Sequence, residues 1–277
     1  MPSFQVLSDL HLEKYSRYGR FKITATAPYL ALLGDIGCVQ QDAQKGIFRG
    51  MLLRLLSQYK AIIYVPGNHE PHNTTWPAVM EWLRTLAKDV DSLRKQGEHI
   101  GQFIPLNRGR YDIEEGGRCV TILGCTLFSW IPPNKKKAVS EQIKDFRKIK
   151  GTEKGSRWTV DDHLEEFCKS VCWLNAEVQK AEAEGREVAI FSHHSPTTDD
   201  RAVEEKYRGD ELTSAYSTDL SAHRCWKSRT VKLWAFGHTH YNCDYVDEFG
   251  KRIFTNQKGY VMVGDSKGYD PAKVVEF

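Results

Sequence analysis

Five short polar motifs, each placed at the end of an apolar run, constrain this chain more than any other feature of its sequence. They offer two aspartates, one asparagine and at least four histidines as possible metal ligands. This set of donors suffices for two metal ions with coordination positions left for a substrate, which is typical of metal-assisted hydrolysis. The motifs are Asp9-Leu10-His11, Gly34-Asp35, Gly67-Asn68-His69-Glu70, His193-His194 and Gly237-His238-Thr239-His240.

Length, composition and cysteine content limit the class of protein and its compartment. The 277 residues suffice for one large domain or two small ones, and 40% hydrophobic with 27% charged residues is ordinary for a soluble globular chain. No apolar run approaches the roughly 20 residues of a membrane span. The first apolar run, Phe4–Leu7, leads straight into Asp9 and leaves no room for a signal peptide. The seven cysteines include no Cys-x-x-Cys pair and are interpreted as reduced, which predicts a cytoplasmic or nuclear protein without a membrane partner.

Apolar runs and amphipathic stretches predict the secondary structure. Most of the predicted strands are continuous apolar runs, which indicates burial on both faces. Helices are predicted over 46–59, over 77–95 with Thr74 or Thr75 as cap, and from a capping box at Thr159–Asp162 to Gly185. The predicted strands are Phe4–Leu7, Tyr29–Leu33, Ala61–Val65, Cys119–Leu123, Val188–Ser192, Val231–Phe236 and Arg252–Asn256.

The order of these elements predicts an α/β fold. Strand, helix and strand alternate in the first third, and more strands follow, so helices would cover the outer faces of two packed sheets. The motifs then fall just past the carboxyl ends of strands, where open α/β sheets place their sites. We expect a single domain over residues 1–277. The region 132–160 breaks the alternation and is interpreted as a basic insertion or lid.

Spacing within the motifs suggests how the ligands converge. Asp9 and His11 are two residues apart, as are His238 and His240, so each pair would point to one side of an extended segment. Asp35 has two carboxylate oxygens and is able to bridge two metal ions.

Together these motifs resemble those of the calcineurin-like metallophosphoesterase superfamily, and the resemblance runs from Asp9 to His240. It implies a four-layer α/β/β/α sandwich of two mixed β-sheets flanked by helices. It also implies a dinuclear site whose bridging ligand is Asp35. The first metal would take Asp9, His11 and His240, and the second would take Asn68, His193 and His238. His194 would either contact the substrate or support the ligands.

The resemblance further implies the chemistry. A hydroxide held between two metal ions would attack phosphorus in line with the leaving oxygen. His69 would act as general acid, with Asn68 beside it as the second catalytic residue, and Glu70 would orient the acid. The mixed oxygen and nitrogen ligands favour two divalent metal ions, with Mn²⁺ preferred and Fe, Zn²⁺, Co²⁺ or Ni²⁺ also compatible.

Departures from the family motifs bear on the substrate, a phosphate ester. No arginine follows Gly34–Cys38, and Ser192–Ser195 lacks the His-Gly-Gly of protein phosphatases, whereas the Gly-His-Thr-His motif is more like that of phosphodiesterase branches. We therefore expect a phosphodiesterase acting on nucleotides, cyclic nucleotides or nucleic acid. The alternatives are a phosphomonoesterase or protein Ser/Thr phosphatase, and a non-catalytic scaffold.

Charge is concentrated in one segment. The net charge of +3 is too small to indicate a nucleic-acid partner, but residues 134–158 contain nine basic and three acidic residues, which gives +6 locally. This segment is either a flap that attracts phosphate-rich ligands or an ordinary solvated surface. Trp130, Phe146 and Trp158 would stack on a base or pack inside the segment.

Overall fold

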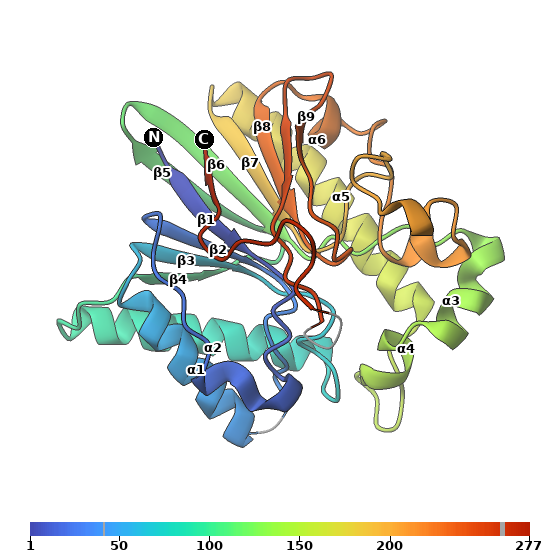
Figure 1. The fold of residues 1–277 in the computed structure, drawn as a ribbon, viewed down its shortest axis with the longest axis horizontal. Coiled ribbons are helices and arrows are strands. Elements are labelled where there is room, and N and C mark those ends of the chain that lie inside the picture. The colour runs from blue at the N-terminus through green and yellow to red at the C-terminus, as the bar shows by residue number, and fades with distance from the viewer. Residues whose placement is uncertain (41, 261–263) are drawn as a thin grey trace.

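Two β-sheets packed face to face form the centre of the computed structural model, which describes residues 1–40, 42–260 and 264–277 (Figure 1). The first sheet has the order β11 (Val274–Glu276), β1 (Ser3–Leu7), β2 (Tyr29–Leu33), β3 (Ala61–Val65) and β4 (Gln102–Pro105). The second has the order β5 (Gly109–Glu115), β6 (Arg118–Cys125), β7 (Glu187–Ser192), β8 (Val231–Phe236), β10 (Arg252–Thr255) and β9 (Asp244–Val246). Both sheets are mixed, because antiparallel β11, β5 and β9 flank parallel inner strands.

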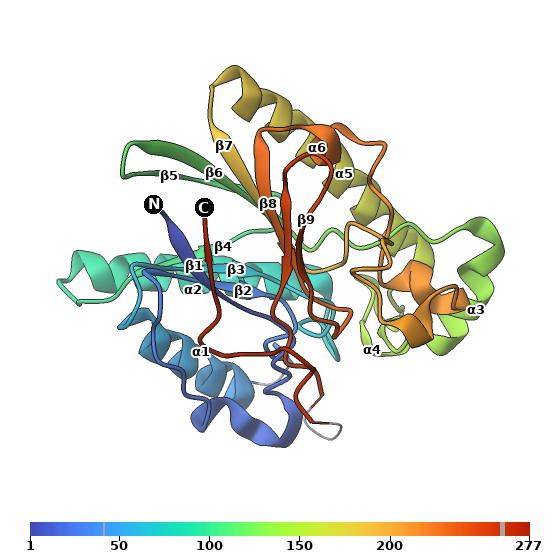
Figure 2. The same cartoon turned by 45° about the horizontal axis from the view of Figure 1, so that its top comes forward.

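Helices cover the outer face of each sheet and complete the predicted four-layer sandwich. Helices α1 (Asp42–Leu56) and α2 (Trp76–Lys95) lie on the first sheet, and α5 (Val160–Ala183) and α6 (Arg224–Lys227) lie on the second (Figure 2). In the part of the chain that the structure describes, every helix is too short or too polar to cross a bilayer.

Burial on both faces of the inner strands explains their continuous apolar sequences. In β2, Leu30 and Leu32 pack under α1 and α2, whereas Ala31 and Leu33 face the second sheet. Alternate residues of each inner strand therefore serve two cores, one beneath the helices and one between the sheets. This packing holds the carboxyl ends of β1, β2, β3, β7 and β8 at one edge of the sandwich.

The segment 132–160 folds into short helices with a small core of its own. It contains η2 (Pro133–Lys135), α3 (Lys136–Gln142) and α4 (Asp145–Lys148), and its core includes Phe146 and Val139. The ring of Trp158 stacks on Phe128 with centroids 5.9 Å apart, so Phe146 and Trp158 pack inside the protein, while Trp130 is 46% exposed. Other short helices are η1 (Lys14–Gly19), η3 (Glu205–Tyr207) and η4 (Glu211–Ala215).

The capping residues in the sequence correctly predicted the start of α2 and both ends of α5. Thr75 caps α2, the reciprocal capping box at Thr159 is present, and Gly185 follows α5 with a φ of +67°. The first predicted helix, 46–59, was misplaced, because α1 begins at residue 42 and ends at residue 56. Strands β4, β5, β9 and β11 were missed because they are short or half-exposed and lack a continuous apolar run, and β5 buries only Ile113.

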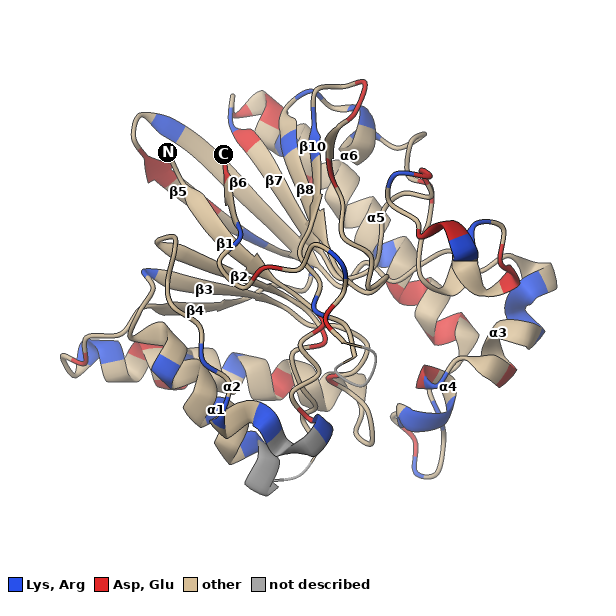
Figure 3. Cartoon of the chain, viewed as in Figure 1, with Lys and Arg blue, Asp and Glu red and all other residues tan. Residues whose placement is uncertain are grey.

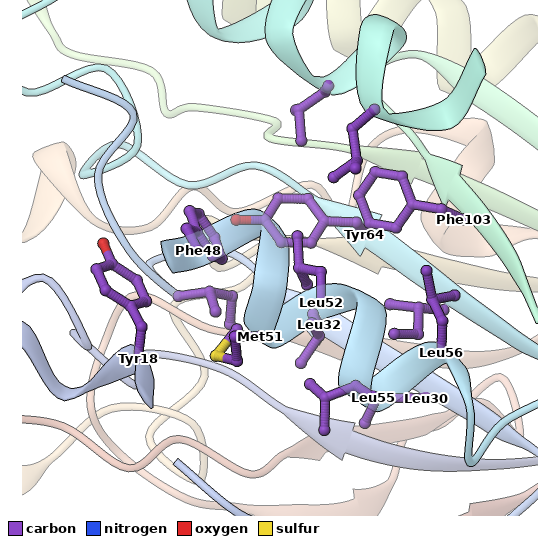
Figure 4. Close-up of a cluster of buried hydrophobic side chains, with 14 of the residues drawn as sticks. Tyr18, Leu30, Leu32, Phe48, Met51, Leu52, Leu55, Leu56, Tyr64 and Phe103 are labelled. Atoms are coloured by element: carbon purple, nitrogen blue, oxygen red, sulfur yellow. The ribbon is translucent and has the colours of Figure 1, made fainter. Parts of the chain in front are cut away.

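Leu52 offers a test of the core beneath α1. Its side chain is fully buried among Leu32, Phe48 and neighbours (Figure 4), whereas Leu53, the next residue on the helix, is half-buried. We expect Leu52→Ala to lower the free energy of unfolding by about 2–5 kcal/mol, because it leaves a cavity. Leu53→Ala is the matched control and should lower the free energy of unfolding clearly less. Urea denaturation measures both values. Equal losses would contradict this packing.

Candidate metal centre

The seven predicted ligands converge at the shared edge of the two sheets. Asp9 and His11 follow β1, Asp35 follows β2 and Asn68 follows β3, while His193 follows β7 and the two remaining histidines follow β8. Hydrogen bonds between the strand ends join the two sheets here. The backbone N–H of His238 donates to the Asp9 carboxylate, with the N–Oδ2 distance 3.0 Å, and His193 Nδ1 lies 2.8 Å from the carbonyl oxygen of Leu33.

Left-handed backbone turns, rather than extended strands, aim these side chains. The argument from strand alternation was therefore wrong, because both pairs of residues lie beyond the ends of β1 and β8. A positive φ costs a residue with a side chain roughly 1–2 kcal/mol, so its repetition at five candidate ligands marks a functional constraint. The φ values are 54° for Asp9, 47° for His11, 54° for Asp35, 71° for His238 and 52° for His240.

One cluster of donors contains Asp9, His11 and His240. The Nε2 atoms of the two histidines face each other at 3.1 Å, and His240 Nε2 lies 3.3 Å from Asp9 Oδ1. Asp9 and His11 are fully buried. The backbone N–H of His240 donates to Gln257 Oε1 over 2.6 Å, which fixes the turn that carries this candidate ligand.

A second cluster contains Asp35, His193 and His238, with Asn68 beside it. His193 Nε2 lies 2.8 Å from Asn68 Oδ1 and 3.4 Å from Asp35 Oδ1. Burial lowers the pKa of His193, and its Nδ1–H donates to the Leu33 carbonyl, so Nε2 presents a lone pair. The oxygens of Asn68 and Asp35 therefore face the lone pair of His193 Nε2.

This donor set fits a cation. Facing acceptors in a buried place repel each other unless a positive charge lies between them. Burial raises the pKa of Asp35, and the nearby carboxylates of Glu70 and Asp9 raise it further. Asp35 also reaches the other cluster, because its Oδ2 is 4.0 Å from His11 Nε2. One carboxylate thus stands between both groups of donors.

Glu70 has a different role from the one expected. It was predicted to orient His69, but its buried carboxylate instead accepts hydrogen bonds from the backbone N–H groups of Asp35, Ile36 and Gly67 and from the Tyr64 hydroxyl. It therefore ties the loop after β2 to the loop after β3. A glutamate two residues beyond a candidate asparagine ligand gives no sequence signal for this role.

His69 is held by two residues that sequence reasoning missed. Its Nδ1 lies 3.2 Å from Glu13 Oε1, and the Tyr260 hydroxyl lies 3.3 Å from its Nε2. Burial lowers the pKa of His69 to about 3, although Glu13 acts in the opposite direction. The imidazole is therefore neutral here, with Nδ1–H on Glu13 and Nε2 turned toward Asp35 Oδ2 at 3.7 Å. The acidic residue two positions after His11 was the available signal for Glu13.

Asp145, from α4 in the basic segment, was also missed. Asn68 Nδ2 donates to both of its oxygens, at 3.0 and 2.9 Å, and His72 Nε2 lies 2.9 Å from Asp145 Oδ1. This bond turns the amide of Asn68 so that its oxygen faces His193. The sequence of α4 gave no signal, because Asp145 is an acid among lysines in an irregular segment.

His194 was expected either to contact substrate or to support the ligands. It is fully buried, its Nδ1 lies 3.2 Å from the carbonyl oxygen of Thr126, and its ring packs 4.1 Å from that of His238. This position favours the supporting role.

Comparisons with known proteins agree with the fold. A family model described as calcineurin-like phosphoesterase matches residues 3–242. An uncharacterized protein of Acanthamoeba polyphaga mimivirus is 28% identical, over 94% of this chain and 92% of its own. The crystal structure of phosphopantetheinyl hydrolase from Mycobacterium tuberculosis is similar, with a TM-score of 0.65, 17% identity and coverage of 94% of this chain and 90% of that one. A dimetal phosphatase from Danio rerio follows, with a TM-score of 0.51, 15% identity and coverage of 92% and 86%.

The contact between Asp145 and Asn68 generates a prediction about metal affinity. Asp145→Ala frees the Asn68 amide, so we expect the affinity for one of two Mn²⁺ ions to fall by about 10–100-fold while the other changes less. Calorimetric titration with Mn²⁺ measures both, and near-ultraviolet circular dichroism verifies folding. Glu141→Ala removes an exposed acid from the same segment and is the control. Unchanged affinities in a folded Asp145 variant would disprove the role.

Proposed function

We propose, because this chain belongs to the calcineurin-like phosphoesterase family, that it is a dinuclear-metal phosphodiesterase acting on nucleotides, cyclic nucleotides or nucleic acid. Family membership supports the coarser statement directly: a metal-dependent hydrolase of phosphoric esters. One observation carries the proposal of a bound cation, namely the buried oxygens of Asn68 and Asp35 that face the lone pair of His193 Nε2.

The proposed ligands divide between two cations. Asp9, His11 and His240 would hold the first, and Asn68, His193 and His238 the second, with Asp35 shared. Two of the three groups of convergent donor atoms, and the position of Asp35 between these two, support this division. Mn²⁺ is the preferred metal in this proposal, and Fe, Zn²⁺, Co²⁺ and Ni²⁺ are compatible with the same ligands. Two such cations, when bound, would polarise a phosphate and lower the pKa of a water molecule, so that it supplies the attacking hydroxide.

His69 is proposed as the group that delivers a proton to the leaving oxygen. Glu13 fixes the plane of its ring through Nδ1, so Nε2 points into the space beside Asp35. Tyr260 contacts the same nitrogen and also stacks on His11 with centroids 4.3 Å apart, which limits the directions open to a leaving group. A proton acquired on Nε2 in the substrate complex would thus be aimed at the ester oxygen.

A diester is preferred to a monoester because of charge. A diester carries one negative charge and a monoester up to two, and no arginine follows Asp35 to bind the second. Among the described residues, the ion pairs of the centre's carboxylates involve histidines and no arginine. A monoesterase, including a protein phosphatase, is the alternative that the first experiment separates.

The proposal predicts a rank order of substrates. Protein reloaded with Mn²⁺ should cleave bis-p-nitrophenyl phosphate with a higher kcat/KM than p-nitrophenyl phosphate. A chelator should abolish both reactions and added Mn²⁺ should restore them. Assays with cyclic nucleotides and single-stranded DNA then show which class of diester is cleaved. Faster monoester cleavage would favour the alternative, and no turnover with two metals bound would favour a scaffold.

The proposed role of His69 predicts a dependence on the leaving group. His69→Asn should retain both metals and lose about 10²–10⁴-fold in kcat on a diester with an alkyl leaving group, but much less on one with a p-nitrophenyl group, which departs without a proton. His99→Asn, on an exposed histidine, is the control. The same loss on both substrates would argue against proton donation.

A further inference from the structure

The helix α4 packs directly against the loop that carries Asn68 and His69. The backbone N–H of Asn73 donates to the carbonyl oxygen of Lys148 over 2.8 Å, and Asp145 binds Asn68 and His72. The basic segment is therefore part of the wall of the metal centre on the side of His69.

Two lysines, one just before α4 and one at its last residue, flank Asp145. Lys144 and Lys148 are four residues apart and share one face of the helix turn next to Asp145, and both side chains are exposed. Within the described ranges, neither lies within 4.0 Å of a carboxylate. By contrast, the guanidinium of Arg147 donates to the carbonyl oxygen of Gln142, away from the centre. The positive charge of α4 is visible in Figure 3.

A third lysine, Lys14, lies near His69. Lys14 Nζ lies 3.3 Å from the centroid of the Tyr260 ring, and the hydroxyl of that ring contacts His69. Burial lowers the pKa of Lys14, and the charges of Lys144 and Lys148 lower it further, whereas Glu13 and Asp35 raise it. The two lysines are therefore near enough to act on the Lys14 ammonium. Lys14 likewise has no carboxylate within ion-pair distance among the described residues.

Three ammonium groups gathered from distant parts of the sequence repel one another. Such an arrangement becomes favourable when an anion lies among them, and a phosphate group offers enough acceptor oxygens for several lysines. The phosphate that is cleaved would lie on the metal centre itself. Lys14 lies against Tyr260, whose hydroxyl contacts His69, and Lys144 and Lys148 flank Asp145, which binds Asn68.

We propose that Lys14, Lys144 and Lys148 form a second phosphate subsite on the leaving-group side of the metal centre. The substrate would then be a phosphodiester whose leaving half carries a further phosphate, either a terminal phosphate of a short nucleotide or the next phosphate of a strand. This inference rests on the proposed function and narrows its substrate class.

The test compares substrates that differ only in phosphate number. The dinucleotide TpT has one phosphate, and pTpTp adds one at each end, so either leaving half is covered. We expect the ratio of kcat/KM for pTpTp over TpT to be about tenfold or more in the wild-type protein, and to approach one in Lys144→Ala/Lys148→Ala. Lys137→Ala/Lys180→Ala removes the same charge from exposed positions elsewhere and should keep the ratio. A ten-residue thymidine strand has only internal phosphates. Its kcat/KM, compared with that of pTpTp, shows whether the subsite binds the next phosphate of a strand or requires a terminal phosphate.

The outcomes separate this inference from the proposed function. Equal ratios in the wild type and the Lys144/Lys148 variant, with TpT cleaved, would overturn the subsite and leave the function standing. If no diester is cleaved, calorimetry with the Mn²⁺-loaded protein decides. Tighter binding of pTpTp than of TpT that disappears in the double variant supports the subsite, and equal affinities overturn it.

Discussion

The mutual repulsion of buried acceptor atoms is the constraint on which the rest of this structure depends. The oxygens of Asn68 and Asp35 face His193 Nε2 because other hydrogen bonds hold all three side chains in place. His193 Nδ1–H donates to the Leu33 carbonyl, the Asn68 amide donates to Asp145, and Asp35 Oδ1 accepts from the backbone N–H of His69. Satisfied on their outer sides, these groups turn their lone pairs inward. A cation is the species that stabilises such an arrangement.

The fold supplies the rigidity that this arrangement needs. Parallel strands buried on both faces bring their carboxyl ends to one edge, and Glu70 fastens two of the resulting loops through three backbone N–H groups. Repeated left-handed φ values at candidate ligands add strain, and packing on all sides of the site offsets it. The segment around α4 completes the wall, so an insertion that looked peripheral contributes Asp145 to the centre.

The sequence predicted which candidate ligands lie together, because each follows an apolar strand and the end of that strand determines where the residue lies. Residues that act from irregular segments could not be found in the same way. Glu13 and Tyr260 reach His69 from loops, and Asp145 reaches Asn68 from a one-turn helix, so their contacts depend on tertiary packing alone. The half-exposed strands β5 and β9 were missed for a related reason, because they carry little apolar signal.

The most direct test of the account is a crystal structure of the protein soaked in Mn²⁺, with anomalous diffraction used to locate the ions. The account predicts two peaks roughly 3.5–4 Å apart, with Asp35 between them, one beside Asp9 and the other beside Asn68. A single peak, or none among these residues at saturating Mn²⁺, would contradict the claim that this donor set is built for two cations.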